Sequence, residues 1–165
     1  KFVLMNSMKI GAIKELPSNN SNPSYIPYND RFIMGGNGIP YGNVLRGYDD
    51  NRVGPLTSTG NPIGGNTLVK FSTEFRVPFA ENPVVYGMVF AEMGNVWSST
   101  DLMERLNLPR SGPLDLKRSI GVGIRFFMPM IGMLGFDLGR GFDRVDINGK
   151  LKPEWKTTLT FGQQF

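Results

Sequence analysis

The sequence predicts an all-β protein, namely an antiparallel transmembrane β-barrel segment of about six strands with one long inward-folding loop. Several stretches alternate apolar side chains with polar side chains or glycine, which is the period of a strand. These stretches reach the roughly 9–11 residues with which a tilted strand crosses a bilayer. The connections between them alternate in length, as in outer-membrane barrels, where extracellular loops are long and periplasmic turns are short.

The composition excludes several other classes of protein. Of the 165 residues, 40% are hydrophobic and 19% are charged, which lies below the roughly 45–50% and 25% of soluble proteins. The chain has no cysteine and no histidine, which removes disulfides, thiol catalysis, the usual general base and the commonest metal ligand. The net charge of +4 is spread along the chain, without the basic stripe that nucleic-acid binding requires. We therefore predict no catalytic residue, no cofactor, no metal site and no nucleic-acid partner.

The alternation places the predicted strands at 2–13, 67–77, 84–97, 119–128, 134–145 and 154–165. We expect one face of these strands to contact lipid and the other to line a water-filled lumen. The residues expected to face lipid are Val69, Phe71, Phe75, Ile120, Val122, Ile124, Phe126, Leu134, Phe136, Leu159 and Phe161. The residues expected to face the lumen are Lys70, Glu74, Arg76, Arg125 and Asp137. The alternative is a soluble β-sandwich or lipocalin-like barrel, in which the same apolar face would form the core.

Local motifs predict details of the ends and connections. Residues 1–5 already alternate like the middle of a strand, so we expect the chain to be cut from a longer protein. The sequence Asp101-Leu102-Met103-Glu104 resembles a capping box, which predicts one or two helical turns between residues 98 and 118. Asn148-Gly149 predicts a tight hairpin turn before the last strand, because a type I′ turn needs positive φ at both positions.

The segment 17–66 shows neither strand nor helix period, yet it is rich in aromatic and aliphatic side chains that need a packing surface. At its centre is the run Val44, Leu45, Arg46, Gly47 and Tyr48. We interpret the segment as a loop that folds back into a cavity, with this run at its tip. The simpler interpretation of Arg46-Gly47 is an ordinary exposed turn. For the adjacent Asp49-Asp50 we favour solvated loop, because neighbouring carboxylates in a sequence rarely converge on one site.

Short motifs along almost the whole chain occur in the order found in one known family. They are Gly35-Gly36-Asn37, the run 44–48, Val53-Gly54-Pro55, Gly64-Gly65-Asn66, Glu74-Phe75, the run 92–97, the run 121–125, Met128-Pro129 and the run 161–165. The chain resembles the carboxy-terminal part of the barrel of the BamA family of outer-membrane protein assembly factors. The resemblance implies that residues 1–165 hold the last strands of a barrel of about sixteen. It also implies that the loop enters the lumen, where Arg46 reaches Glu74 and Glu92 on the barrel wall.

The resemblance further implies a function without enzymatic activity, namely folding other barrel proteins and inserting them into the outer membrane of a Gram-negative bacterium. In that family the last strand forms a lateral seam, which here involves Trp155, Leu159, Phe161, Gly162 and Phe165. The implied partners are unfolded outer-membrane clients, the lipid bilayer and accessory lipoproteins bound through periplasmic domains that the chain lacks. The alternative is a translocation pore of the same superfamily, either TamA-like or of the two-partner secretion type. A plain diffusion porin would need no inward Arg-Gly-Tyr loop.

Overall fold

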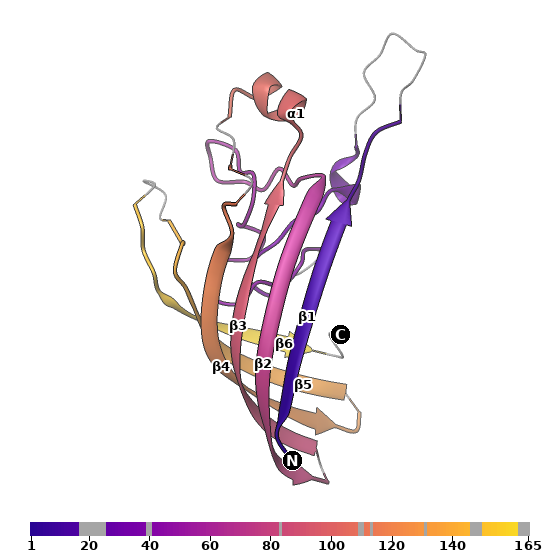
Figure 1. Cartoon of the computed structure of the whole chain (residues 1–165), viewed down its shortest axis with the longest axis vertical. Coiled ribbons are helices and arrows are strands. Elements are labelled where there is room, and N and C mark those ends of the chain that lie inside the picture. Colours follow the sequence, from indigo (N-terminus) through magenta and orange to yellow (C-terminus); the bar gives the residue numbers. More distant parts are fainter. Residues whose placement is uncertain are drawn as a thin grey trace.

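The computed structural model describes residues 1–16, 26–38, 41–82, 84–108, 111–112, 114–130, 132–145 and 150–161. Its strands are β1 (Val3–Ala12), β2 (Thr67–Glu81), β3 (Val84–Trp97), β4 (Lys117–Met128), β5 (Gly132–Gly141) and β6 (Trp155–Phe161). They form one six-stranded antiparallel sheet in the order β1-β2-β3-β4-β5-β6 (Figure 1). The predicted all-β antiparallel fold is confirmed.

The sheet is strongly curved, and the long loop lies on its concave side. In Figure 1, β5 and β6 turn behind the plane of β1 to β3, and the loop between β1 and β2 runs through the space behind these strands. Each strand pairs with the next along the chain, so β1 and β6 are the two edges of the sheet in the described part of the chain. A curved sheet with antiparallel neighbours is the geometry of a partial barrel.

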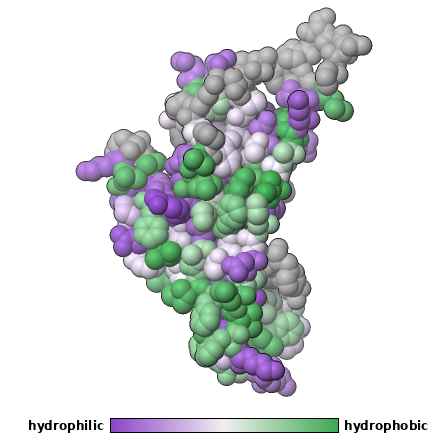
Figure 2. All heavy atoms as spheres, viewed as in Figure 1, coloured by the Kyte–Doolittle hydropathy of each residue, from purple (hydrophilic) through white to green (hydrophobic). Residues whose placement is uncertain are grey.

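The two faces of the sheet differ as the alternation predicts. On the convex face Ile120, Val122 and Phe136 are 45%, 50% and 46% exposed, and Figure 2 shows apolar side chains over much of this face. On the concave face Glu74 and Asp137 are buried. A soluble barrel or sandwich would bury the apolar row and expose the polar one, so this alternative does not fit. A barrel wall whose apolar face contacts lipid fits these exposures.

One residue of the predicted apolar row is buried. Leu134 is 9% exposed, although it lies in the same row of β5 as Phe136. Its cross-strand neighbours are Phe126 on β4 and Phe161 on β6, and two large rings therefore flank it. We infer that Leu134 fills the space between these rings and does not itself form the lipid surface.

Several strand boundaries differ from the predicted ones. β2 does not end before Pro78 but continues to Glu81, with a shift of register between Pro78 and Ala80. Proline has no N–H to donate to the ladder, and an irregularity of this kind accommodates it. β5 begins at Gly132, earlier than predicted, and ends at Gly141. β1 and β4 differ from their predicted ranges by one or two residues, and residues 162–165 of the predicted last strand lie outside the described residues.

Among the described residues, two short helical segments occur in the connections at the long-loop end of the sheet (Figure 1). Helix α1 spans Thr100–Arg105 within the β3–β4 connection, and η1 spans Tyr28–Asp30. The predicted capping box is wrong, because the N-cap of α1 is Ser99, without a side-chain hydrogen bond, and Asp101 lies inside the helix. The predicted turn at Asn148-Gly149 lies outside the described residues. In the part of the chain that the structure describes, no helix is both long and apolar enough to cross a membrane.

The core lies between the loop and the inner face of β2 and β3. Its buried residues are Met34, Leu45, Tyr48, Val53, Leu68 and Val96, with Phe32 packed against them. Isolated bridges from Phe32 to Gly65 and from Gly36 to Leu45 fix the path of the loop. The loop is therefore a folded part of the barrel interior, and its aromatic and aliphatic residues supply most of this core.

Candidate functional site

Arg46 at the tip of the loop is held by Glu92 of β3 through two different groups. Its Nη2 atom lies 2.8 Å from Oε1 of Glu92, and its backbone N–H donates to Oε2 of the same carboxylate at 2.9 Å. The side chains of Arg46 and Glu92 are 4% and 1% exposed. Burial at this level makes the pair costly to break, because either partner alone would be a stranded charge.

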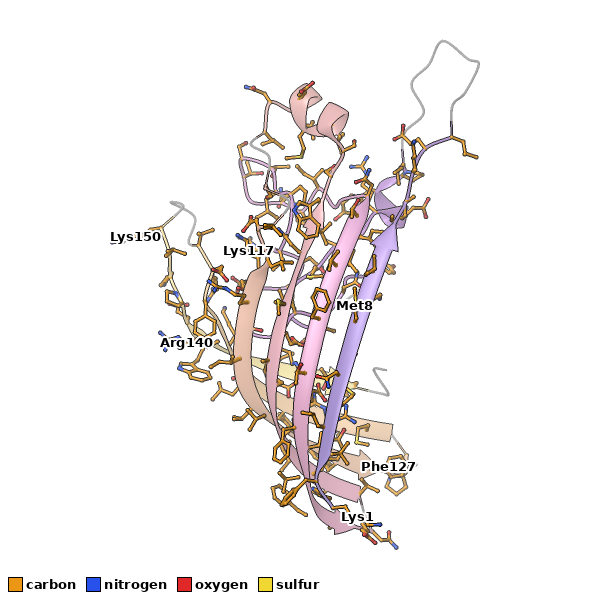
Figure 3. All side chains as sticks on the ribbon, in the orientation of Figure 1. Lys1, Met8, Lys117, Phe127, Arg140 and Lys150 are labelled. Carbon is orange, nitrogen blue, oxygen red and sulfur yellow. The ribbon has the colours of Figure 1, made fainter. Side chains whose placement is uncertain are left out.

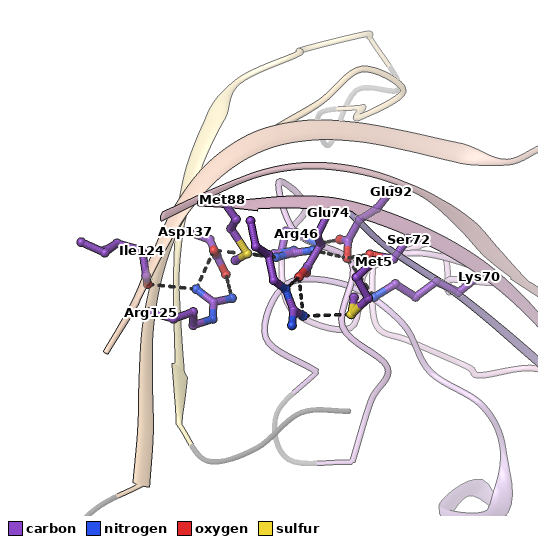
Figure 4. Close-up of polar contacts among 11 residues, drawn as sticks. Met5, Arg46, Lys70, Ser72, Glu74, Met88, Glu92, Ile124, Arg125 and Asp137 are labelled. Atoms are coloured by element: carbon purple, nitrogen blue, oxygen red, sulfur yellow. Dashed lines mark hydrogen bonds and ion pairs between the residues drawn. The ribbon is translucent and has the colours of Figure 1, made fainter. Parts of the chain in front are cut away.

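The Arg46 guanidinium is the centre of a larger cluster of charges on the inner wall (Figure 4). Its Nη2 atom also lies 2.7 Å from Glu74 of β2, and its Nη1 atom lies 3.8 Å from Asp137 of β5. Each carboxylate has a second cation, namely Lys70 for Glu92, Arg76 for Glu74 and Arg125 for Asp137. Four cations minus three carboxylates leaves a charge of +1, so the charges of the cluster nearly cancel.

An aromatic ring completes the surroundings of Arg46. Its Cζ atom lies 3.7 Å from the centroid of the Phe90 ring, which is 1% exposed. A cation over a desolvated ring face adds attraction that no carboxylate supplies. The Phe90 ring has room because Gly121 lies on the next strand, and a Cβ there would collide with the ring. The sequence prediction missed Phe90, although it shares a face with Glu92 two residues on.

Gly47 brings the loop backbone directly onto β5. Its φ is +85°, a conformation that glycine adopts without strain. A Cβ on Gly47 would lie 2.8 Å from the backbone nitrogen of Gly141. On the facing strand, a Cβ on Gly139 would lie 2.9 Å from the backbone nitrogen of Gly47. Three glycines thus permit this close approach of two backbones, and the sequence prediction identified only Gly47.

Tyr48 fixes the end of the run to β4 and to the turn after β5. Its hydroxyl donates to the carbonyl of Arg118 at 2.8 Å and accepts from the backbone N–H of Asp143 at 3.3 Å. Burial raises the pKa of the Tyr48 phenol, which therefore stays neutral and keeps its proton to donate. The Asp143 carboxylate closes the triangle by accepting hydrogen bonds from Arg118, and these hold the pKa of Asp143 below its usual range.

The two apolar residues at the start of the run differ in burial. Leu45 is fully buried in the core cluster, whereas Val44 is half-buried. The structure therefore brings Leu45, Arg46, Gly47 and Tyr48 against the inner wall, together with Glu74 and Glu92. Arg46-Gly47 is not an exposed turn, which was the simpler interpretation.

A comparison with known protein families shows the superfamily to which the chain belongs. The model of the Omp85 superfamily domain matches residues 1–165. The chain belongs to the Omp85 superfamily. No curated protein sequence matches it. Omp85 proteins are outer-membrane proteins, so this chain is a β-barrel segment of the outer membrane, and membership indicates a role in protein insertion or translocation.

The predicted seam strand of this Omp85 chain lies next to the Arg46 cluster, because Thr158 of β6 is the cross-strand partner of Asp137 on β5. β6 carries Trp155, Leu159 and Phe161 on its convex face, and these pair with Arg140, Phe136 and Leu134 of β5. Trp155 and Phe161 are 53% and 55% exposed, as lipid-facing residues would be. Gly162 and Phe165 lie outside the described residues.

The interpretation of Asp49 as solvated loop is wrong. Its carboxylate is paired with Arg144 and with Lys156 of β6. Burial raises the pKa of Asp49, but the hydrogen bonds from Lys156 and Arg144 outweigh burial, so the pKa is lowered. No local pattern could have predicted these partners, because they lie roughly a hundred residues away in the chain. The Omp85 loop is therefore attached at Asp49 as well as at Arg46 and Tyr48.

Proposed function

We propose that this Omp85 chain is the carboxy-terminal barrel portion of a non-enzymatic assembly factor, which folds other outer-membrane barrels and inserts them into the membrane. In this proposal β6 is the lateral seam, and an unfolded client pairs with its free edge. Accessory lipoproteins bound through periplasmic domains of a longer Gram-negative protein belong to the same proposal. The observation that carries it is the buried Arg46 cluster, which fixes the loop to β2, β3 and β5 beside the edge strand.

The physical basis is β-augmentation. An edge strand presents unpaired N–H and C=O groups, and an incoming strand can satisfy them without any nucleophile or cofactor. An edge that templates other chains must keep its position while its partner changes. The Arg46 cluster supports such an edge, because it ties the neighbouring wall, including Asp137 on β5, to one rigid loop tip.

The test is client assembly by the full-length protein in lipid vesicles. We expect the protein to accelerate folding of an unfolded barrel client, followed by its heat-dependent gel mobility. We expect Arg46→Ala to lose most of this acceleration. The matched control is Arg52→Ala, since Arg52 is an exposed arginine in the same loop. If Arg46→Ala accelerated client folding as fully as the wild type, the cluster would have no part in the proposed function.

The seam is tested separately by cross-linking. A photoreactive side chain at Thr157, on the convex face of β6, should capture the terminal strand of the client. The same side chain at Ile124 should not, because β4 is paired on both sides. Transport of a soluble passenger without any client folding would instead identify the translocation pore of the same superfamily.

A further inference from the structure

The carboxylate of Asp49 joins the lumen loop to both sides of the β5–β6 connection. Its Oδ2 atom lies 2.8 Å from Nη2 of Arg144, in the part of the connection that follows β5. Its Oδ1 atom lies 2.8 Å from Nζ of Lys156, at the start of β6. The side chains are 34%, 14% and 37% exposed, in the order Asp49, Arg144 and Lys156. Asp49 is thus a half-buried anion between two cations.

Further pairs continue this contact across the base of the connection. Arg144 also binds Glu154 at 2.9 Å, and Glu154 binds Lys152 at 2.8 Å. The backbone N–H of Lys152 donates to the carbonyl of Arg144 at 2.8 Å, next to the bridge from Val145 to Leu151. In Figure 3 the connection extends away from the sheet, with Lys150 towards its outer end. The Asp49 contact lies at the opposite end, where the chain enters β6.

The position of Lys156 explains why this contact concerns the edge strand. Lys156 is the cross-strand partner of Gly139 on β5, and Gly139 is one of the two β5 glycines against which Gly47 packs. The loop, β5 and β6 therefore lie side by side at Gly47, Gly139 and Lys156. β6 is paired with β5 on one side, while its other side is an edge in the described part of the chain. The later residues of its concave face, Thr158 and Thr160, carry no charge.

We propose that Asp49 is a positioning residue that holds the start of β6 against the lumen loop, and that it thereby sets the place of the templating strand. This inference rests on the proposed function of β6 as the seam. Arg46 fixes the loop to β2 and β3, and Asp49, three residues later, carries that fixed position to β6. Half-exposed ion pairs are weak, so the attachment of β6 is reversible, which suits a strand that must exchange partners.

The first experiment measures the position of β6 by amide hydrogen exchange over residues 155–161 in the full-length protein in lipid. Asp49→Asn should raise the exchange rate roughly two- to fivefold, the range for a partly exposed ion pair. Lys156→Gln should have a similar effect, and the double variant should add little to either. Asp49→Glu keeps the carboxylate and should retain most of the protection. Equal exchange in Asp49→Asn and wild type, or strict additivity in the double variant, would overturn the anchor.

The matched control is Asp50→Asn, the same change of charge one residue away. Asp50 is exposed and accepts a hydrogen bond from the backbone N–H of Asn37, which asparagine can also accept. We expect its exchange and its client folding to equal those of the wild type. If Asp50→Asn matched Asp49→Asn, the effect would be one of general loop charge and the proposal would fall.

The second experiment measures client folding by the same variants. Asp49→Asn should slow client folding roughly twofold or more, and Asp49→Glu should restore most of the rate. Faster exchange in β6 with unchanged client folding would overturn the positioning role. A wild-type protein that folds no client would overturn the proposed function instead, and amide exchange alone would then decide whether Asp49 anchors β6.

Discussion

Glu92 holds Arg46 by its backbone and its side chain at once, with Oε2 accepting from the backbone N–H at 2.9 Å and Oε1 lying 2.8 Å from Nη2. The backbone contact fixes where the loop tip lies, and the side-chain contact fixes which residue occupies it. A single carboxylate therefore couples the path of the loop to the identity of Arg46. Both contacts are desolvated, so neither is easily replaced by water.

Replacement of Arg46 should destabilise the attachment of the loop and leave the strands intact. Breaking a buried ion pair costs roughly 3–5 kcal/mol because the remaining charge is stranded. Here we expect about 3 kcal/mol for Arg46→Ala, because Lys70 still accompanies Glu92 and Arg76 still accompanies Glu74. Arg46→Lys should recover only part of this, since an ammonium lacks the planar fork. The measurement is protease sensitivity of the loop in the full-length protein.

A double-mutant cycle with Glu92→Gln separates the pair from its surroundings. We expect strong coupling of the two changes, because each removes the same buried contact. Circular dichroism of the barrel should be unchanged in all members of the cycle. Independent, additive effects on loop cleavage would contradict the geometry of the site.

Gly47→Ala should displace the loop tip from β5. The φ of +85° is strained for alanine, and the new Cβ would meet the backbone of Gly141 and Arg140, which cannot move as a side chain can. We expect a loss of stability of more than about 1 kcal/mol, measured as a lower midpoint of unfolding in denaturant. Gly112→Ala is the control, because a Cβ there has no neighbour within 4 Å. A similar midpoint for both variants would show that the tip does not need this approach.

The alternation of residues was enough to predict the sheet and its two faces. It places Glu74 and Glu92 on the concave side because a strand repeats every two residues, whatever its surroundings. It could not predict the end of β2, since Pro78 is tolerated where the register shifts. Nor could it predict the glycines that face Gly47 or the cations that bind Asp49. Those contacts depend on the curvature of the sheet and on the path of a loop that has no sequence period, and neither can be predicted from a local sequence pattern.

Leu45→Ala should weaken the core beneath the loop. Leu45 is 0% exposed and packs with Met34, Val53 and their neighbours. Truncation of a buried leucine removes apolar contacts and leaves a cavity, at a cost of roughly 2–5 kcal/mol. Thermal or denaturant unfolding of the loop, followed by protease sensitivity, measures the effect. Leu114→Ala is the control because Leu114 is 88% exposed, and equal effects of the two would argue against a folded loop core.

The triangle of Tyr48, Arg118 and Asp143 should give the loop a dependence on pH. Hydrogen bonds from Arg118 lower the pKa of Asp143 from its ordinary value of 3.8. A carboxylate with a lowered pKa in the folded state stabilises that state fully above its ordinary pKa, and this stabilisation is lost as the pH falls through the lower folded value. Protease-resistant attachment of the loop should therefore decline only below about pH 4, and it should be flat at higher pH as far as Asp143 is concerned.

Two variants assign this decline to the triangle. Asp143→Asn should remove the Asp143 part of the acid sensitivity while lowering loop attachment at neutral pH, because the neutral amide binds Arg118 less strongly. Tyr48→Phe should lower attachment at every pH, by about 0.5–1.5 kcal/mol for each hydrogen bond lost. It removes the hydroxyl that donates to the Arg118 carbonyl and accepts from the Asp143 N–H, and it removes no group that titrates in this range. Acid sensitivity that is identical in Asp143→Asn and wild type would show that other carboxylates, Asp49 among them, control the attachment. In that case Asp49→Asn is the next variant to compare. The pKa of the Asp49 carboxyl is also lowered, and removing this carboxyl should abolish the same decline.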